Sequence, residues 1–193
     1  MKATPVTGRP SPEPLQAGSG YAEPFELLSA CHERVQRSLD MLERLNAHCA
    51  SHGADARAAS AAADVLRYFD IAAPLHHQDE ELHVFPALEA GGDAALADLC
   101  VRLRAEHRQI EQRWQTLRPL LQDLIDGRLD LRPLADASQT FIDIHRLHLL
   151  DENDQVFPAA ESTLGPAQQH DMGLEMAGRR GLDLSGSAAP GSR

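Results

Sequence analysis

Residues 76–87 read HHQDEELHVFPA, and a matching stretch, HLLDENDQVFPA, occupies residues 148–159. Both stretches fit the pattern H-x3-E-x3-V-F-P-A at all six fixed positions, so that His76 is the counterpart of His148. A match of this length is hard to obtain by chance and indicates an internal duplication. Each copy keeps one histidine and one glutamate four residues apart, a spacing that places both side chains on one face of a helix.

The apolar residues on either side of these stretches recur at steps of three and four, which is typical of amphipathic helices. We expect such helices over roughly 24–50, 55–90, 93–126 and 132–161. The first aligns with the third, with His32 matched to His107, and the second aligns with the fourth. Four helices with short connections predict an all-α, antiparallel up-and-down four-helix bundle. The duplication predicts a pseudo-twofold axis through its core.

Prolines within the helical segments predict local distortions. Pro74 should bend or break the second helix near residues 72–73, and Pro86 predicts a second distortion in the same helix. Pro119 should kink the last turns of the third helix.

Composition divides the chain into three parts. Residues 1–20 are rich in Pro, Gly and Ser and lack a hydrophobic pattern, so we expect a disordered leader. Residues 21–164 hold the predicted bundle. Residues 165–193 hold a short amphipathic helix at about 166–178 and then a Gly/Ser/Ala/Pro-rich tail that we expect to be disordered.

Charge and cysteine content narrow the classes of function. The formal net charge of −11 over 193 residues argues against a nucleic-acid partner and against an anionic membrane. No apolar run approaches the roughly 18 residues that span a bilayer. The three cysteines, Cys31, Cys49 and Cys100, have no CxxC spacing, which is typical of reduced thiols in the cytoplasm. The sequence identifies no protein partner.

Each predicted helix places one histidine on its apolar face, and two helices add a glutamate one turn later. The six residues are His32, His76, Glu80, His107, His148 and Glu152. Burying four imidazoles and two carboxylates is costly unless they find partners, and two divalent ions would offset that cost. Each ion would take two histidine nitrogens, and Glu80 and Glu152 would bridge both ions. Such a site leaves coordination positions open, unlike a closed structural zinc site.

Other histidines near these positions leave alternatives open. H-x3-E pairs occur at 76/80, 77/81, 107/111 and 148/152, so the spacing alone is a weak signal. His76 and His148 each lie nine residues before a phenylalanine, which favours the 76/80 pair over 77/81. His145 lies one turn before His148 and is an alternative ligand or a partner of one.

Several acidic residues beside the six also lack a settled role. Glu106 and Glu111 flank His107, and either could orient its ring, although a solvated face is the simpler interpretation. We expect Asp79 and Asp151 to be solvated or to contact the ligands from outside.

At these residues the chain resembles the hemerythrin-like proteins with an HHE cation-binding domain, over about residues 24–161. The resemblance is carried by His32, by Glu106-His107, and by the two H-x3-E motifs, each followed by V-F-P. It implies a four-helix bundle around two iron ions in a non-haem, oxo- or hydroxo-bridged centre. The four histidines would be terminal ligands, and Glu80 and Glu152 would be bridges.

The chain departs from the oxygen-carrying hemerythrins at two positions. Those proteins have a second histidine four residues after the ligand of their third helix, where this chain has Glu111. They also use an aspartate bridge five residues after the last histidine, whereas Glu152 follows His148 by four. The ligand set is therefore more symmetrical and is similar to that of bacterial HHE proteins, including the type that repairs iron–sulfur clusters.

These observations predict a di-iron protein that binds O2 or NO for sensing, scavenging or iron and oxygen homeostasis. No residue in the sequence is singled out as catalytic, so we expect a binding protein rather than an enzyme. One alternative is reduction of NO or peroxide, or iron–sulfur-cluster repair, at the same centre. Another is a metal-dependent regulatory module in which the segment carrying Met172 and Met176 moves.

Overall fold

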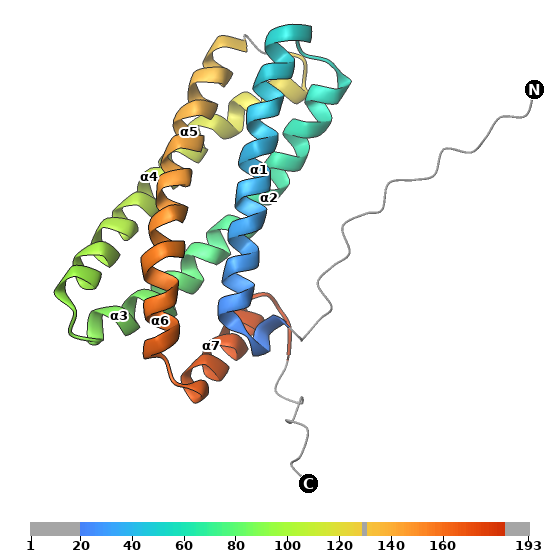
Figure 1. Cartoon of the computed structure of the whole chain (residues 1–193). Coiled ribbons are helices and arrows are strands. Elements are labelled where there is room, and N and C mark those ends of the chain that lie inside the picture. Colours follow the sequence, from blue (N-terminus) through green and yellow to red (C-terminus); the bar gives the residue numbers. More distant parts are fainter. Residues whose placement is uncertain (1–19, 129–130, 184–193) are drawn as a thin grey trace, which may run out of the picture.

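The computed structural model describes residues 20–128 and 131–183, which form helices and no strand (Figure 1). The long helices are α1 (Pro24–His52), α2 (Ala56–Asp79), α4 (Ala94–Ile125) and α5 (Leu131–Asp151). The shorter ones are η1 (Gly20–Ala22), α3 (Phe85–Ala90), α6 (Phe157–Thr163) and α7 (Pro166–Arg179). The expected all-helical class is confirmed. The predicted leader up to residue 19 and the tail from residue 184 lie outside the described residues.

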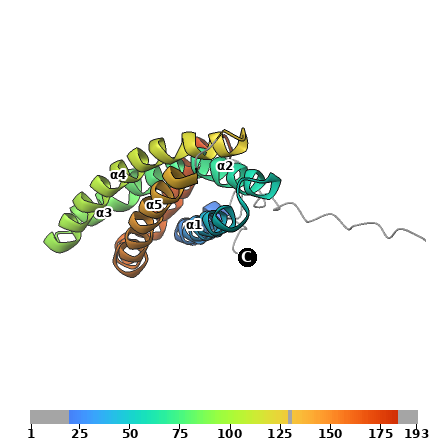
Figure 2. The ribbon, with the colours of Figure 1, turned by 90° about the horizontal axis from the view of Figure 1, so that it is seen from above.

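The four long helices form one helical bundle. Contacts join α1 to α2, α2 to α4, α4 to α5, and α5 back to α1. Seen from above, α2 and α4 lie on one side and α1 and α5 on the other (Figure 2). The apolar faces that the sequence predicts turn inward and form the core.

The core consists of two apolar clusters with a polar layer between them. One cluster includes Leu39, Leu117 and Phe141, and the other includes Leu28 and Leu103. Along α1 and α4, the buried histidine comes between residues of one cluster and residues of the other. The bundle therefore holds its buried polar groups in the middle, away from both ends.

One wide turn follows each H-x3-E motif and begins at the glutamate of that motif. The π segments η2 (Glu80–Val84) and η3 (Glu152–Val156) join α2 to α3 and α5 to α6. In each, the N–H of the following phenylalanine donates to the glutamate carbonyl five residues earlier. Pro86 and Pro158 come next, and a proline ring crowds the carbonyl four residues before it, so a widened turn relieves that contact. The predicted distortion at Pro86 is confirmed.

The other two prolines leave their helices unbroken. Helix α2 continues through Pro74 to Asp79, so of the predicted bend or break near residues 72–73, the break does not occur. Helix α4 likewise continues through Pro119 to Ile125. A proline inside a helix removes one backbone hydrogen bond. Phe69, Ala73 and His76 are buried on both sides of Pro74, and their packing holds the helix together despite that loss.

Helix α7 packs against the bundle through a close backbone contact and a buried ion pair. A side-chain carbon added at Gly173 would lie 1.9 Å from the carbonyl oxygen of Tyr21. Asp79 is fully buried and accepts hydrogen bonds from Arg179 and Arg180, the latter at 2.6 Å. Asp79 is thus not a solvated residue but the point where α7 is attached beside Glu80.

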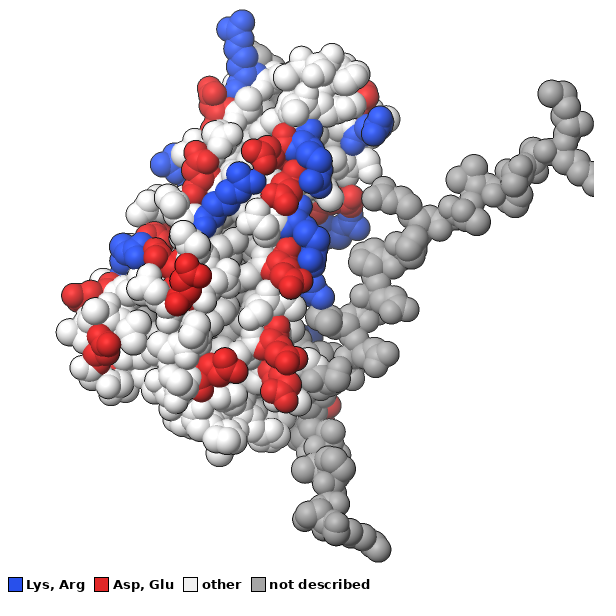
Figure 3. Space-filling model, in the orientation of Figure 1, with Lys and Arg blue, Asp and Glu red and all other residues white. Residues whose placement is uncertain are grey.

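The face formed by α1 and α5 carries interspersed acidic and basic side chains (Figure 3). Arg146 of α5 pairs with Asp40 at 3.2 Å and Glu43 at 2.9 Å on α1. These exposed pairs each contribute little to stability, about 0–1 kcal/mol, and mainly link the two helices. Within the described residues, every helix is too short or too polar to cross a membrane.

We expect Gly173→Ala to destabilise the protein, because the new methyl group would overlap the Tyr21 carbonyl and push α7 away from η1. The cost should be on the order of 1–3 kcal/mol, seen as a lower melting temperature and faster proteolysis at α7. Gly178→Ala in the same helix is the matched control, since a methyl group there meets nothing within 4 Å. Equal melting temperatures for the two variants would contradict this account of how α7 is held.

Candidate metal centre

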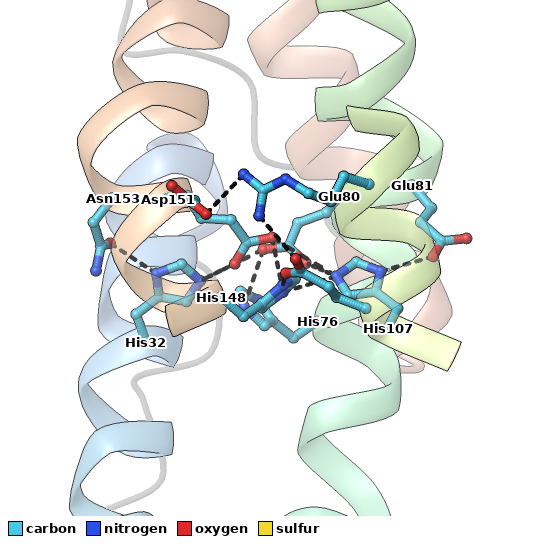
Figure 4. A network of polar contacts seen from close by, with 11 residues as sticks. His32, His76, Glu80, Glu81, His107, His148, Asp151 and Asn153 are labelled. Atoms are coloured by element: carbon cyan, nitrogen blue, oxygen red, sulfur yellow. Dashed lines mark hydrogen bonds and ion pairs between the residues drawn. The ribbon is translucent and has the colours of Figure 1, made fainter. Parts of the chain in front are cut away.

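The six predicted ligands meet in the polar layer of the bundle (Figure 4). Each long helix contributes one histidine, and the two π segments contribute the glutamates. All six side chains are at most 4% exposed, although imidazole and carboxylate groups are ordinarily hydrated. They are His32, His76, Glu80, His107, His148 and Glu152.

One set of four donor atoms, which we call position A, lies toward α1. The Nε2 atom of His32 is 3.2 Å from Oε2 of Glu152, and Nε2 of His76 is 3.1 Å from Oε1 of Glu80. His32 also lies 3.5 Å from Oε1 of Glu80. The four residues can place their donor atoms within 4.8 Å of one another, a spacing that suits a single ion.

The second set, position B, lies toward α4 and uses the other oxygen of each glutamate. Nε2 of His148 is 3.1 Å from Oε1 of Glu152, and Nε2 of His107 is 3.4 Å from Oε2 of Glu80. These donor atoms also lie within 4.8 Å of one another. Each carboxylate therefore directs one oxygen toward A and one toward B, the arrangement a bridging ligand requires.

The hydrogen bonding of these buried atoms fits a pair of cations. Both oxygens of Glu80, both oxygens of Glu152 and both ring nitrogens of His76 have no hydrogen-bond partner among the described residues. The close approaches between these nitrogens and oxygens lack hydrogen-bond geometry. A buried polar atom without a partner costs roughly 1–3 kcal/mol, and more if charged. Nitrogen and carboxylate donors together suit divalent transition metals, so the residues present fit two such ions.

The same contacts shift the pKa values of the buried groups. Burial alone would lower the pKa of His32, but the carboxylates of Glu152 and Glu80 raise it to about 10. The pKa of His107 rises to about 10 for the same reasons. Although burial and mutual repulsion oppose it, the surrounding histidines hold the pKa values of Glu80 and Glu152 below their usual range. Without a cation, protonated imidazoles therefore balance the carboxylates.

The pKa values of His148 and His76 are shifted in opposite directions. Burial would lower the pKa of His148, but Glu152 and Glu106 raise it to about 9. Its Nε2 lies 3.1 Å from Nε2 of His107, and such a contact has room for one proton, not two. Burial keeps the pKa of His76 below its usual value.

Polar groups outside the six fix the orientation of three imidazoles. The Nδ1–H of His32 donates to Oδ1 of Asn153 at 2.7 Å, and that of His107 donates to Oε1 of Glu81 at 2.7 Å. The Nδ1–H of His148 donates to Oε2 of Glu106 at 3.0 Å. A proton on Nδ1 leaves the Nε2 lone pair directed at the centre, as metal binding requires.

The sequence interpretation was wrong for one of these acidic residues and agrees with the structure for the other. Glu106 was expected to orient its neighbour His107 or to be solvated, but it contacts His148. Glu81 was expected to lie outside the ligand set, and it supports His107. Asn153 was missed, although it is the counterpart of Glu81 in the second motif and could have been found by comparing the two copies.

The alternative histidines occupy distinct places. His77 stacks on His107 with ring centroids 4.0 Å apart and planes within 10°, so both rings cannot point a lone pair at one ion in this arrangement. A nitrogen of His77 still lies within 4.8 Å of donor atoms of His107 and His148. His145 is buried, donates from Nδ1 to the carbonyl of Phe141 at 2.9 Å, and belongs to none of the converging groups in the described chain.

Two surface hollows reach the edge of the centre, one at His107 and one at His32. A cavity of about 570 Å³ lies between α2 and α4, is lined by His77, Glu81 and His107, and has Trp114 among its aromatic walls. A hollow of about 490 Å³ between α1 and α5 is lined by His32, among other residues. Each hollow is thus lined by one of the six buried residues, His107 on one side and His32 on the other.

Comparison with known proteins agrees with this geometry. The sequence profile of the hemerythrin HHE cation binding domain matches residues 23–160, which include all six buried residues. An uncharacterized protein of Haemophilus influenzae is 31% identical over 169 residues, which cover 87% of this chain and 95% of that relative. The chain belongs to the hemerythrin HHE cation-binding domain family.

Proposed function

We propose that this protein holds two iron ions at positions A and B and binds O2 or NO there, for sensing, scavenging or iron and oxygen homeostasis. The observation that carries the proposal is that both glutamates direct one oxygen to each position. Bound iron would supply the electrons with which a reduced centre takes up a diatomic ligand. The resemblance to hemerythrins supports iron over other divalent metals.

The residues of the chain would hold the two ions, orient the imidazole rings and exclude water from the centre. His32 and His76 would hold one ion, His107 and His148 the other, and the two glutamates would span them. Phe157 stacks on His32 with centroids 4.6 Å apart, and Phe85 stacks on His107 at 5.6 Å. These rings cover the imidazoles with apolar surface, so bulk water is kept from the centre except through the two hollows.

We infer that the bundle is antiparallel and arose by duplication of a two-helix unit. In Figure 1 the chain runs along α1 and returns along α2 and α3, then runs along α4 and returns along α5 and α6. The segments α2–η2–α3 and α5–η3–α6 have the same order and π segments of equal length. These features support a pseudo-twofold relation between positions A and B.

We also propose that residues 21–164 form the metal-binding domain and that residues 165–193 add α7 and a tail. Cys31, Cys49 and Cys100 are all free thiols, which supports a cytoplasmic location.

Anaerobic reconstitution with Fe(II) should give about two iron ions per chain and, after exposure to O2, a visible absorption band from charge transfer to iron. Addition of NO to the reduced protein should change its spectrum. His148→Ala should lose iron from the centre and keep most of its helix content. His170→Ala, at an exposed position in α7, should bind like the wild type.

Iron well below two per chain in the wild type, or no spectral change with O2 or NO, would contradict the proposal. Turnover of NO or peroxide beyond that of free iron would replace binding with catalysis at the same centre.

Metal binding should release protons at neutral pH. The raised pKa values of His32, His107 and His148 mean that His32 holds a second proton above pH 7 and that His107 and His148 share one between their Nε2 atoms, whereas a metal needs these lone pairs free. Apparent affinity for Co(II) should therefore rise between about pH 6.5 and 8.5. Calorimetry in two buffers of different ionisation enthalpy measures the released protons. Uptake without any net proton release would show that the imidazoles are neutral before the metal arrives.

A further inference from the structure

Positions A and B have the same types of candidate ligand, two histidines and two shared glutamates. The residues that contact these histidines from outside the ligand set differ between the two positions. The alignment of the two sequence copies relates the two halves, so each residue near A has a counterpart near B. His32 corresponds to His107, and His76 corresponds to His148. The differences lie in the groups that contact these histidines from outside.

The first difference concerns His32 and His107. Both donate from Nδ1 at 2.7 Å, His32 to the amide oxygen of Asn153 and His107 to the carboxylate of Glu81. Asn153 and Glu81 are counterparts, since each directly follows the glutamate of its motif. The hydrogen bond is thus the same in both halves, while the acceptor is neutral at A and charged at B.

The second difference concerns His76 and His148. His148 donates from Nδ1 to Glu106 at 3.0 Å, and Arg102 fixes the other oxygen of that carboxylate at 2.8 Å. Cys31 is the counterpart of Glu106, since each directly precedes the matched histidine of its helix. Among the described residues, Nδ1 of His76 has no hydrogen-bond partner. At position B, therefore, a carboxylate accepts the Nδ1–H of each histidine, whereas at position A no carboxylate of the described residues does so.

A third difference points in the same direction. His77 stacks on His107 and brings another ring nitrogen near position B. Its counterpart in the second motif is Leu149, which lines the hollow beside His32 and offers no donor.

A carboxylate that accepts the outer N–H of a ligating histidine makes the imidazole a stronger donor and fixes its ring. Removing such a partner typically costs about 10–100-fold in metal affinity. Glu81 is 39% exposed, so solvent weakens its charge, but its hydrogen bond is direct. The carboxylate of Glu106 is only 18% exposed, and the Arg102 contact also holds it in place.

We propose that the two metal positions are unequal: B binds its ion at least about tenfold more tightly than A. Glu81 and Glu106 act as positioning residues for B. This inference rests on the proposed metal centre. At limiting metal the chain would hold one ion, in position B, and position A would fill only as the metal concentration rises.

Titration of the metal-free protein with Co(II) against a competing chelator tests this inequality, because the visible spectrum of Co(II) reports each binding event. The wild type should show two steps separated by about tenfold or more. Glu81→Gln replaces the acceptor at B with an amide and should weaken the tight step by about tenfold. Asn153→Asp adds a carboxylate at A without changing side-chain length and should strengthen the weak step.

Glu111→Gln is the matched control, since Glu111 lines the same cavity as Glu81 but, among the described residues, accepts no hydrogen bond from a histidine. It removes the same charge and should leave both steps unchanged. A crystal soaked with one equivalent of Co(II) should show anomalous scattering at B. Circular dichroism of each variant verifies that the helices are intact.

Two ions bound with equal affinity, or a first ion found at A, would overturn the inequality and leave the proposed centre standing. If Glu111→Gln and Glu81→Gln weakened Co(II) binding equally, Glu81 would act only through its negative charge. That result would overturn its role as a positioning residue. Failure of the wild type to bind any metal would overturn the proposed centre, and this inference with it.

Discussion

The burial of two carboxylates at the middle of an apolar bundle is the constraint on which the rest of the centre depends. Glu80 and Glu152 are fully buried, and an unpaired buried charge costs several kcal/mol. Four histidines, one from each long helix, surround these carboxylates and can balance them by holding protons or by sharing metal ions. Because each carboxylate reaches histidines of several helices, the contacts within the candidate metal centre also join the helices of the bundle.

Because of the π segments, one short stretch of chain supplies both a glutamate of the centre and the phenylalanine that packs on a histidine of the centre. In an α-helix, residues four apart such as Glu80 and Val84 already share a face, whereas residues five apart lie about 140° from each other. The wide turn of η2 brings Phe85, five residues after Glu80, toward the buried side as well, where it lies against His107. The V-F-P sequence after each glutamate is therefore part of the site, because it permits the wide turn.

The convergence of the six candidate ligands and the helical class could be predicted from the sequence because both follow from periodicity along single helices. The partner of Glu106 could not, since adjacent residues point about 100° apart and Glu106 faces α5 while His107 faces the centre. The buried pairing of Asp79 with two arginines far along the chain has no local signal either. The predicted break at Pro74 failed because packing on the buried face outweighs one lost hydrogen bond.

Positions A and B share Glu80 and Glu152. This sharing explains why the two halves have the same residue types at the candidate ligands but different residue types around them. A change at Glu80 or Glu152 would disturb both metal positions at once, because each carboxylate faces both. A change at Asn153 or Glu81 affects one imidazole and one position. The residues that support the imidazoles are thus free to differ between the two positions while the shared glutamates are not, and such differences can make two positions with the same candidate ligands chemically different.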